Sequence, residues 1–202
     1  AELGSKLVLP CDVTDTASMD AVFATLAKEW GRLDYLVHAI AFADKAELDG
    51  RYVETTRANF LRTMDISVYS FTDVAKRAEP LMTDGGTMFA MSYHGAAKVV
   101  PTYSVMGPVK AALEACCRYL AYELGGQGIR VHAISPGPLK TRAASGLKDF
   151  DLLLVEAAQR APIGELVDIM DVGFACAYLA TPFARRISGG TVYVDGGVNI
   201  MA

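Results

Sequence analysis

The fold is decided by residues 86–138, which read GTMFAMSYHGAAKVVPTYSVMGPVKAALEACCRYLAYELGGQGIRVHAISPGP. Gly86–Met91 and Arg130–Ser135 are short apolar runs of the kind that form buried strands. Ser104–Leu124 between them has apolar residues at helical spacing, and Gly125 is a typical stop signal just after it. Two strands joined by a connection long enough to hold a helix lie parallel in one sheet. We therefore expect this segment to form a strand, a helix and a parallel strand.

The same alternation of strands and helices continues on both sides of this segment. Further strands are predicted at Lys6–Leu9, Tyr35–Ala39 and Thr191–Val194. Further helices are predicted at Ser18–Trp30, Thr55–Pro80 and Asp168–Leu179, with a weaker helical pattern at Asp151–Arg160. No linker or repeat divides the chain, so residues 1–202 are expected to form a single α/β domain, a doubly wound parallel sheet with helices on both faces. Ligands of such sheets bind at the carboxyl ends of the strands.

The composition excludes several classes of protein. Of the 202 residues, 52% are hydrophobic, and the formal net charge of −4 gives no electrostatic reason to expect nucleic acid or an anionic membrane as a partner. The four cysteines show neither a CxxC spacing nor a nearby histidine cluster, so we expect free thiols and no metal site. We find no signal peptide and no apolar run long enough for a membrane helix, and we therefore expect a cytoplasmic protein.

Tyr103 and Lys110 are the first candidates for catalysis. They are seven positions apart, a spacing that places two helical side chains on nearly the same face of a helix. A lysine cation close to a tyrosine lowers the pKa of the phenol, which helps the hydroxyl to stabilise an enolate or donate a proton. Chance and helix amphipathicity also produce this pair, so the spacing alone leaves an ordinary packing role open. Pro108 lacks a backbone N–H and therefore places the helix start near Ser104–Gly107.

The motifs around these residues are more specific than the pair itself. They are CDV at 11–13, LVHAIAFA at 36–43, SYHGAAKVVPTYSVMGPVKAALEA at 92–115, IRVHAISPGPLKTRAASGLKDF at 129–150, and ISGGTVYVDGGVNIMA at 187–202. With these motifs the chain resembles the short-chain dehydrogenase/reductase superfamily and, within it, the bacterial enoyl-[acyl-carrier-protein] reductases. The resemblance covers nearly the whole chain.

The spacing around Tyr103 separates the subfamilies. Most members of the superfamily have a lysine four positions after the tyrosine and a serine thirteen positions before it, where this chain has Gly107 and Ala90. The enoyl reductases have a lysine seven positions after it and a second tyrosine ten positions before it, and Lys110 and Tyr93 occupy those positions. The resemblance therefore favours an enoyl reductase over a reductase of ketones.

The resemblance implies catalytic roles for three side chains. Tyr103 would hydrogen-bond the thioester carbonyl and stabilise the enolate that forms when hydride reaches the β-carbon. Lys110 would hold the nicotinamide ribose. Tyr93 would lie beside the substrate carbonyl as a catalytic residue, or would serve only as an aromatic wall of the pocket. The three histidines occupy no catalytic position of the family and are expected to be structural or exposed.

The resemblance also implies a cofactor-binding set and a substrate pocket. The cofactor-binding residues would be Asp12, Val13, Ile40, Lys110, Leu139, Lys140, Thr141, Arg142 and Ala143. Asp12 also fits a helix or turn cap. The acyl chain would contact Phe42, Ala43 and Met106, for which plain core packing is the alternative. The weakly patterned stretch 141–162 is expected to act as a substrate lid.

The implied fold is a Rossmann-type, three-layer α/β domain that departs from the family at its N-terminus. The family begins with a strand, a glycine-rich turn, a helix and a second strand, and this sequence starts beyond them. We therefore expect the N-terminal strands and the glycine-rich turn to be missing from this chain. Lys6–Leu9 would then be the third strand in the sheet order 3-2-1-4-5-6-7.

The implied function is reduction of the trans-2 double bond of an enoyl-acyl-carrier-protein thioester by hydride from NADH, in fatty-acid elongation. NADPH is the alternative cofactor, since the residue that reads the ribose 2′ position would belong to the missing segment. The partners would be the carrier-protein-bound substrate and further copies in a homotetramer, with no nucleic acid and no membrane. The alternatives are another short-chain reductase that acts on a ketone or alcohol, and a catalytically inactive paralogue that serves as a binding subunit.

Overall fold

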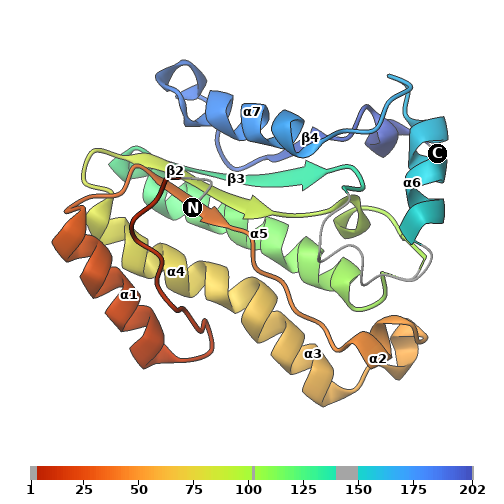
Figure 1. Cartoon of the computed structure of the whole chain (residues 1–202), viewed down its shortest axis with the longest axis horizontal. Helices are drawn as coiled ribbons and strands as arrows, with labels where there is room; N and C mark the ends of the chain where they lie inside the picture. Colours follow the sequence, from red (N-terminus) through yellow and green to blue (C-terminus); the bar gives the residue numbers. More distant parts are fainter. Residues whose placement is uncertain (1–3, 102, 140–149, 202) are drawn as a thin grey trace.

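The centre of the fold is a four-stranded parallel sheet. The computed structural model describes residues 4–101, 103–139 and 150–201. The strands lie side by side in the order β1 (Tyr35–His38), β2 (Gly86–Met91), β3 (Ile129–Pro136) and β4 (Thr191–Val194), as Figure 1 shows. The strands predicted at these four places are confirmed, and so is their parallel direction.

Helices cover both faces of the sheet and give the expected three layers (Figure 1). On one face lie α1 (Thr16–Glu29), α3 (Arg57–Met64), α4 (Ser70–Ala78) and α5 (Met106–Leu124), and on the other lies α7 (Ile169–Ala180). The other helical segments include α2 (Lys45–Leu48), α6 (Phe150–Arg160) and the 3-10 turns Tyr52–Glu54, Glu79–Leu81, His94–Ala96, Gly125–Gln127, Pro182–Ala184 and Val198–Ile200. Helices therefore cover both faces of the central strands β2 and β3, as parallel sheets require, while Tyr35 and Val37 of the edge strand β1 are each 56% exposed.

Alternate residues of the strands supply the two cores. Met88 of β2 packs with α4 and α5 in the larger core, which also contains Val131 of β3. Phe89, the next residue of β2, points to the opposite face and packs with Ile134 and with Leu179 of α7. This alternation follows from the two-residue repeat of a strand. It explains why the strand sequences are apolar at nearly every position.

The predicted strand at Lys6–Leu9 is wrong. The segment is not a strand in the structure, and the Val8 side chain is 83% exposed. A strand is defined by the ladder of hydrogen bonds to a neighbour, and none of the described segments pairs with these residues. Apolar, β-branched sequence alone does not create that neighbour.

The helix predicted over Thr55–Pro80 is divided into three parts. α3 and α4 are joined by a π-helix, Asp65–Tyr69, and the segment Glu79–Leu81 is a 3-10 turn. A π turn adds one residue to a helical turn and is frequent at functional sites. α5 begins at Met106, which confirms the start expected from Pro108. Among the residues that the structure describes, no helix is both long and apolar enough to cross a membrane.

Candidate active site

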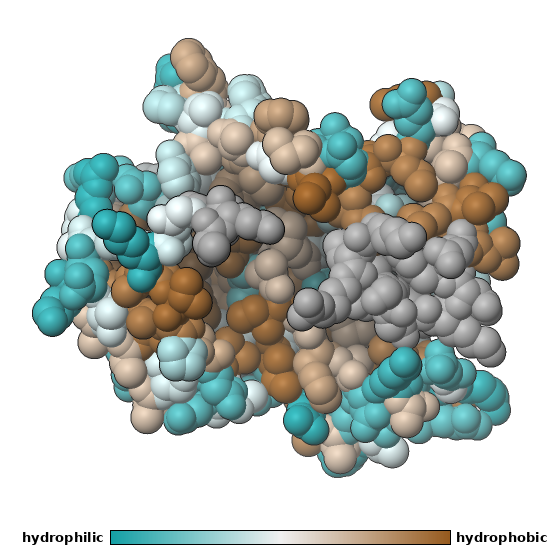
Figure 2. Space-filling model, in the orientation of Figure 1, coloured by the Kyte–Doolittle hydropathy of each residue, from teal (hydrophilic) through white to brown (hydrophobic). Residues whose placement is uncertain are grey.

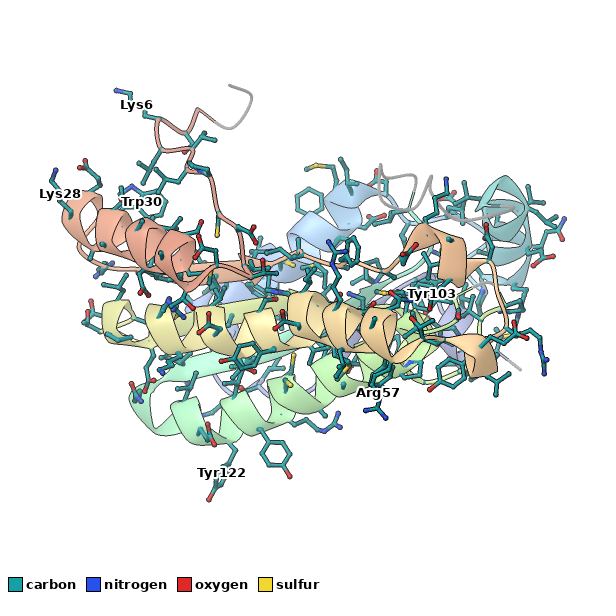
Figure 3. The ribbon with its side chains drawn as sticks, turned by 90° about the horizontal axis from the view of Figure 1, so that it is seen from below. Lys6, Lys28, Trp30, Arg57, Tyr103 and Tyr122 are labelled. Atoms are coloured by element: carbon teal, nitrogen blue, oxygen red, sulfur yellow. The ribbon has the colours of Figure 1, made fainter. Side chains whose placement is uncertain are left out.

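The end of β2 and the start of α5 bring Tyr93 and Tyr103 together. Tyr93 follows β2 with an extended backbone, at a φ of −157°. Its ring meets the ring of Tyr103 edge to face, with 4.9 Å between the ring centroids and 65° between the planes. Figure 3 shows Tyr103 at the end of the molecule where α2 and the first turn of α5 lie. The two tyrosines predicted as catalytic are therefore neighbours at the carboxyl edge of the sheet.

Tyr103 is not part of the helix that carries Lys110. It lies in the turn before α5, and the following residue, Ser104, has a left-handed φ of 42°. The prediction that one helical face presents both side chains is therefore wrong, because the chain turns sharply between Tyr103 and Met106. Gly95 makes room for the ring, since a Cβ atom at this position would lie 2.5 Å from Cδ1 of Tyr103. The ring is thus held between Tyr93 and the backbone at Gly95.

Lys110 of α5 is buried, at 6% exposure. Its Nζ donates a hydrogen bond of 2.6 Å to the backbone carbonyl oxygen of Met91, the last residue of β2. Burial lowers the pKa of Lys110 to about 8, and the nearby Glu114 carboxylate partly opposes that change. The ammonium group has three N–H donors, and Met91 is the one acceptor that binds it among the described residues. Two donors are therefore available to a ligand.

The pKa of Tyr103 moves in the opposite direction from the one predicted. Burial raises the pKa of Tyr103, and the neighbouring Tyr93 raises it further. Burial also raises the pKa of Tyr93. The Lys110 ammonium does not offset the effect of burial, since it is bound to the Met91 carbonyl rather than to the phenol. Both hydroxyls are therefore neutral near pH 7 and are suited to donate hydrogen bonds.

The segment after β1 is held by the π-helix between α3 and α4. The Ser67 hydroxyl accepts a hydrogen bond of 2.9 Å from the backbone N–H of Phe42 and donates one of 3.1 Å to its carbonyl oxygen. Earlier in the chain, in α3, the side-chain oxygen of Asn59 accepts from the backbone N–H of Asp44 at 3.1 Å. Sequence reasoning missed both contacts, because residues 25 and 15 positions apart in a helix and a loop leave no periodic signal. They fix the path of the backbone that carries Ile40 and Ala43.

Among the predicted cofactor-binding residues, Asp12 and Val13 lie in the turn before α1. The Asp12 carboxylate accepts hydrogen bonds from the hydroxyl and the backbone N–H of Thr14, at 2.7 and 2.9 Å. These bonds lower the pKa of Asp12, with the side-chain bond as the larger cause. The turn-cap alternative is therefore observed, while the helix cap of α1 is Asp15. Both accepted bonds fall on Oδ1.

For the other residues predicted to bind the cofactor or the substrate, the structure gives mainly the exposure of the side chain. Ile40 is 37% exposed after β1, and Phe42 and Ala43 are half-buried. Met106 is 6% exposed and belongs to the larger core, so its packing alternative is observed. Leu139 is half-buried at the end of a described segment. The remaining predicted cofactor residues, Lys140, Thr141, Arg142 and Ala143, lie outside the described residues, as does the first part of the predicted lid.

Two of the three histidines, His38 and His132, are buried, in agreement with the expectation of structural roles. His38 and His132 are 2% and 0% exposed, and burial lowers the pKa of each to about 4. His38 hydrogen-bonds the Ser70 hydroxyl at 2.7 Å, and His132 stacks on Phe89. His94 is half-buried in the turn after Tyr93. Over the residues described, no group of His, Cys, Asp and Glu is arranged to hold a metal ion.

A parallel sheet with helices on both faces, and a pair of tyrosines with a buried lysine at its carboxyl edge, define a Rossmann-type reductase. Comparison with known proteins makes this class more specific. The family model described as "Enoyl-(Acyl carrier protein) reductase" matches residues 1–199. The chain therefore belongs to the enoyl-(acyl carrier protein) reductase family.

Two curated relatives show the closeness of the match. The chain is 54% identical over 196 residues to enoyl-[acyl-carrier-protein] reductase [NADH] 1 of Rhizobium meliloti (strain 1021), covering 97% of this chain and 72% of the relative. It is 46% identical over 203 residues to enoyl-[acyl-carrier-protein] reductase [NADH] FabI of Escherichia coli (strain K12), covering 100% of this chain and 78% of that protein.

Solved structures give the same result for the fold. The enoyl-(acyl-carrier-protein) reductase of Anaplasma phagocytophilum in complex with NAD has a TM-score of 0.93 and 51% identity, with 100% of this chain and 75% of that one covered. The Bacillus cereus enoyl-acyl carrier protein reductase with NADP+ and an indole naphthyridinone has a TM-score of 0.96 and 41% identity, with 100% and 79% covered. The Rossmann-type fold is thereby confirmed.

Proposed function

We propose that the protein reduces the trans-2 double bond of enoyl thioesters carried on acyl carrier protein, with NADH as the hydride donor, in fatty-acid elongation. The observation that supports it most is that the end of β2 brings together the ring contact between Tyr93 and Tyr103 and the carbonyl of Met91 that binds the buried Lys110. The curated relatives support it as well, since their names give NADH and an enoyl-carrier-protein substrate.

The residues present fit a nicotinamide dinucleotide. Lys110 offers two N–H donors at the carboxyl edge of the sheet, which suit the vicinal hydroxyls of a ribose. The segment that carries Ile40 is fixed by hydrogen bonds and leaves this side chain exposed. The carboxylate of Asp12 is exposed and accepts its bonds through one oxygen, so the other is free to accept from an adenine amine. When bound, NADH supplies the hydride that reduces the double bond.

Tyr103 is proposed as the group that stabilises the enolate. A neutral hydroxyl donates a hydrogen bond to the thioester carbonyl oxygen, and this bond strengthens as negative charge develops there. Burial raises the pKa of Tyr103, so the proton stays on the phenol until the oxygen accepts it. The edge-to-face contact with Tyr93 and the close approach of Gly95 hold the ring in one orientation. Tyr93 itself is proposed to orient Tyr103 and to line the pocket.

The substrate pocket and the assembly are also part of the proposal. Phe42 and Ala43 would meet the acyl chain beside the tyrosines, and the stretch 141–162, of which α6 is a described part, would act as its lid. The proposed location is the cytoplasm. A homotetramer is proposed from exposed aromatic side chains. Tyr122 of α5 is 86% exposed and points away from the body of the molecule in Figure 3, and Phe174 of α7 is 66% exposed. Figure 2 shows further hydrophobic patches on the surface that it draws.

A substrate comparison tests the function. The protein should consume NADH with crotonyl thioester and leave acetoacetyl thioester unreduced, since the spacing of Tyr93, Tyr103 and Lys110 is that of the enoyl reductases. The same assay with NADPH should give a lower kcat/KM. Reduction of the ketone in preference to the enoyl substrate would contradict the proposal, and so would absence of NADH consumption with either.

A further inference from the structure

Two hydrogen bonds join the end of β2 to neighbouring turns of α5. Lys110 Nζ donates to the carbonyl oxygen of Met91, and the Ser92 hydroxyl donates to Oε1 of Glu114, both at 2.6 Å. Met91 and Ser92 are consecutive, while Lys110 and Glu114 are four residues apart and so lie on one face of the helix. The bonds therefore fix both the register of α5 against β2 and the position of the Glu114 carboxylate.

Ser92 is itself firmly held. It is 6% exposed, and its backbone N–H donates a hydrogen bond of 2.7 Å to the carbonyl oxygen of Ile134 in β3. The sheet therefore fixes the position of the Ser92 hydroxyl, and this hydroxyl orients the Glu114 carboxylate toward the buried face of α5. Tyr93, the next residue, belongs to the candidate active site, so the same strand end carries both the tyrosine and the serine.

We propose that Glu114, oriented by Ser92, is a positioning residue that keeps the buried Lys110 in its ammonium form and thereby sets the pH range in which the site binds its cofactor. The part of this proposal that concerns the cofactor rests on the proposed function. The effect of Glu114 on the protonation of Lys110 does not. Of the residues described, none forms an ion pair with Lys110, so Glu114 acts through its electrostatic field rather than by direct contact.

The other titratable groups around Lys110 are neutral in the working range. Cys117 of α5 and His38 of β1 both interact with Lys110, but burial raises the pKa of Cys117 to about 12 and lowers that of His38 to about 4. Tyr193 of β4 faces Glu114, and burial, Glu114 and Asp195 raise its pKa. Each of these groups is therefore uncharged near pH 7. The Glu114 carboxylate is the charge that opposes the burial of the ammonium.

The variant Glu114→Gln tests this directly. Glutamine retains a side-chain oxygen to accept the Ser92 hydrogen bond, so the link to β2 is kept while the charge is removed. The matched control is Glu123→Gln, which removes the same charge from an exposed position of the same helix. The probe is the Cε resonance of Lys110 in protein labelled with carbon-13 lysine, assigned with Lys110→Arg and titrated without cofactor.

We expect the pKa of Lys110 to fall by about one unit in Glu114→Gln, as loss of the opposite charge one helical turn away predicts. It should be unchanged in Glu123→Gln. Ser92→Ala leaves the carboxylate in place without its anchor, and should lower the pKa of Lys110 by a smaller amount. An unchanged Lys110 pKa in Glu114→Gln overturns the proposal. If that variant does not fold, an unchanged or raised pKa in Ser92→Ala overturns it instead.

The second measurement is the Kd of NADH, determined by direct titration at a series of pH values. If the ammonium form binds the cofactor, the upper pH limit of NADH binding should move down with the Lys110 pKa, and Kd near pH 8 should rise about fivefold in Glu114→Gln. A shifted Lys110 pKa with an unshifted binding limit overturns the cofactor part of the proposal. A wild-type protein that binds no NADH at any pH overturns the proposed function, while the lysine titration still decides the effect of Glu114.

Discussion

Replacing Tyr103 with phenylalanine removes one oxygen atom and keeps the ring between Tyr93 and Gly95. The size of the expected loss in kcat follows from the protonation state of the hydroxyl that is removed. Burial raises the pKa of Tyr103, so the hydroxyl is a full donor across the neutral range and no phenolate takes over its role at pH 7. Removing one donor to a developing oxyanion in a water-excluded site costs about 2.7–4 kcal/mol, or about 10²–10³ in kcat. We expect a loss of that order in Tyr103→Phe.

Steady-state reduction of crotonyl thioester, followed by the consumption of NADH, measures this loss. NADH affinity, measured by direct titration, should stay within about twofold of wild type, because the lost bond forms mainly as the enolate develops. Tyr93→Phe is the matched control, since it removes a hydroxyl from the neighbouring ring, and it should cost less. If Tyr103→Phe keeps its turnover within about threefold, or loses NADH affinity as strongly as turnover, the role given to Tyr103 is wrong.

Three further predictions follow from the packing around the site. Ser67→Ala leaves the backbone N–H and carbonyl of the half-buried Phe42 without their partner, so it should lower the melting temperature and raise Kd for NADH. Unchanged values of both would show that the contact does not hold the loop. His132 has a folded pKa of about 4 against 6.5 unfolded, so the stability it contributes is complete above pH 6.5 and is lost as the pH falls toward 4, by about 3 kcal/mol. In His132→Phe, thermal melts should show a smaller loss over that range, and an equal loss would contradict the assignment. Hydrogen exchange in 150–162 should slow when NADH and an acyl-pocket inhibitor bind together, and equal rates would exclude a lid.

The sequence predicts most of the fold because local patterns determine most of it. The apolar runs at Gly86–Met91 and Thr191–Val194 become strands with those bounds, and Pro108 places the start of α5 correctly. Lys6–Leu9 shows where such patterns are insufficient, because a strand exists only with a partner. The π-helix at Asp65–Tyr69 also has no periodic signature, since the apolar pattern continues through it.

The candidate site is less accessible to sequence reasoning. The identity of Tyr93, Tyr103 and Lys110 follows from family spacing, but their arrangement does not. Helical periodicity wrongly places Tyr103 on the face of α5, and it gives the wrong direction for the pKa of the phenol, because the partner of Lys110 is a strand carbonyl. Contacts such as Ser92 with Glu114 join distant segments and require the tertiary structure.

The central claim is that hydride reaches the β-carbon of an enoyl thioester while the enolate is stabilised at the Tyr103 hydroxyl. The most direct measurement uses NADH deuterated at the transferred position, with crotonyl thioester in ordinary water, and locates the label in the product by NMR. The account predicts butyryl thioester with one deuterium on the β-carbon and a solvent proton on the α-carbon. Deuterium on the α-carbon, or an enoyl substrate left unreduced while a ketone is consumed, would contradict it.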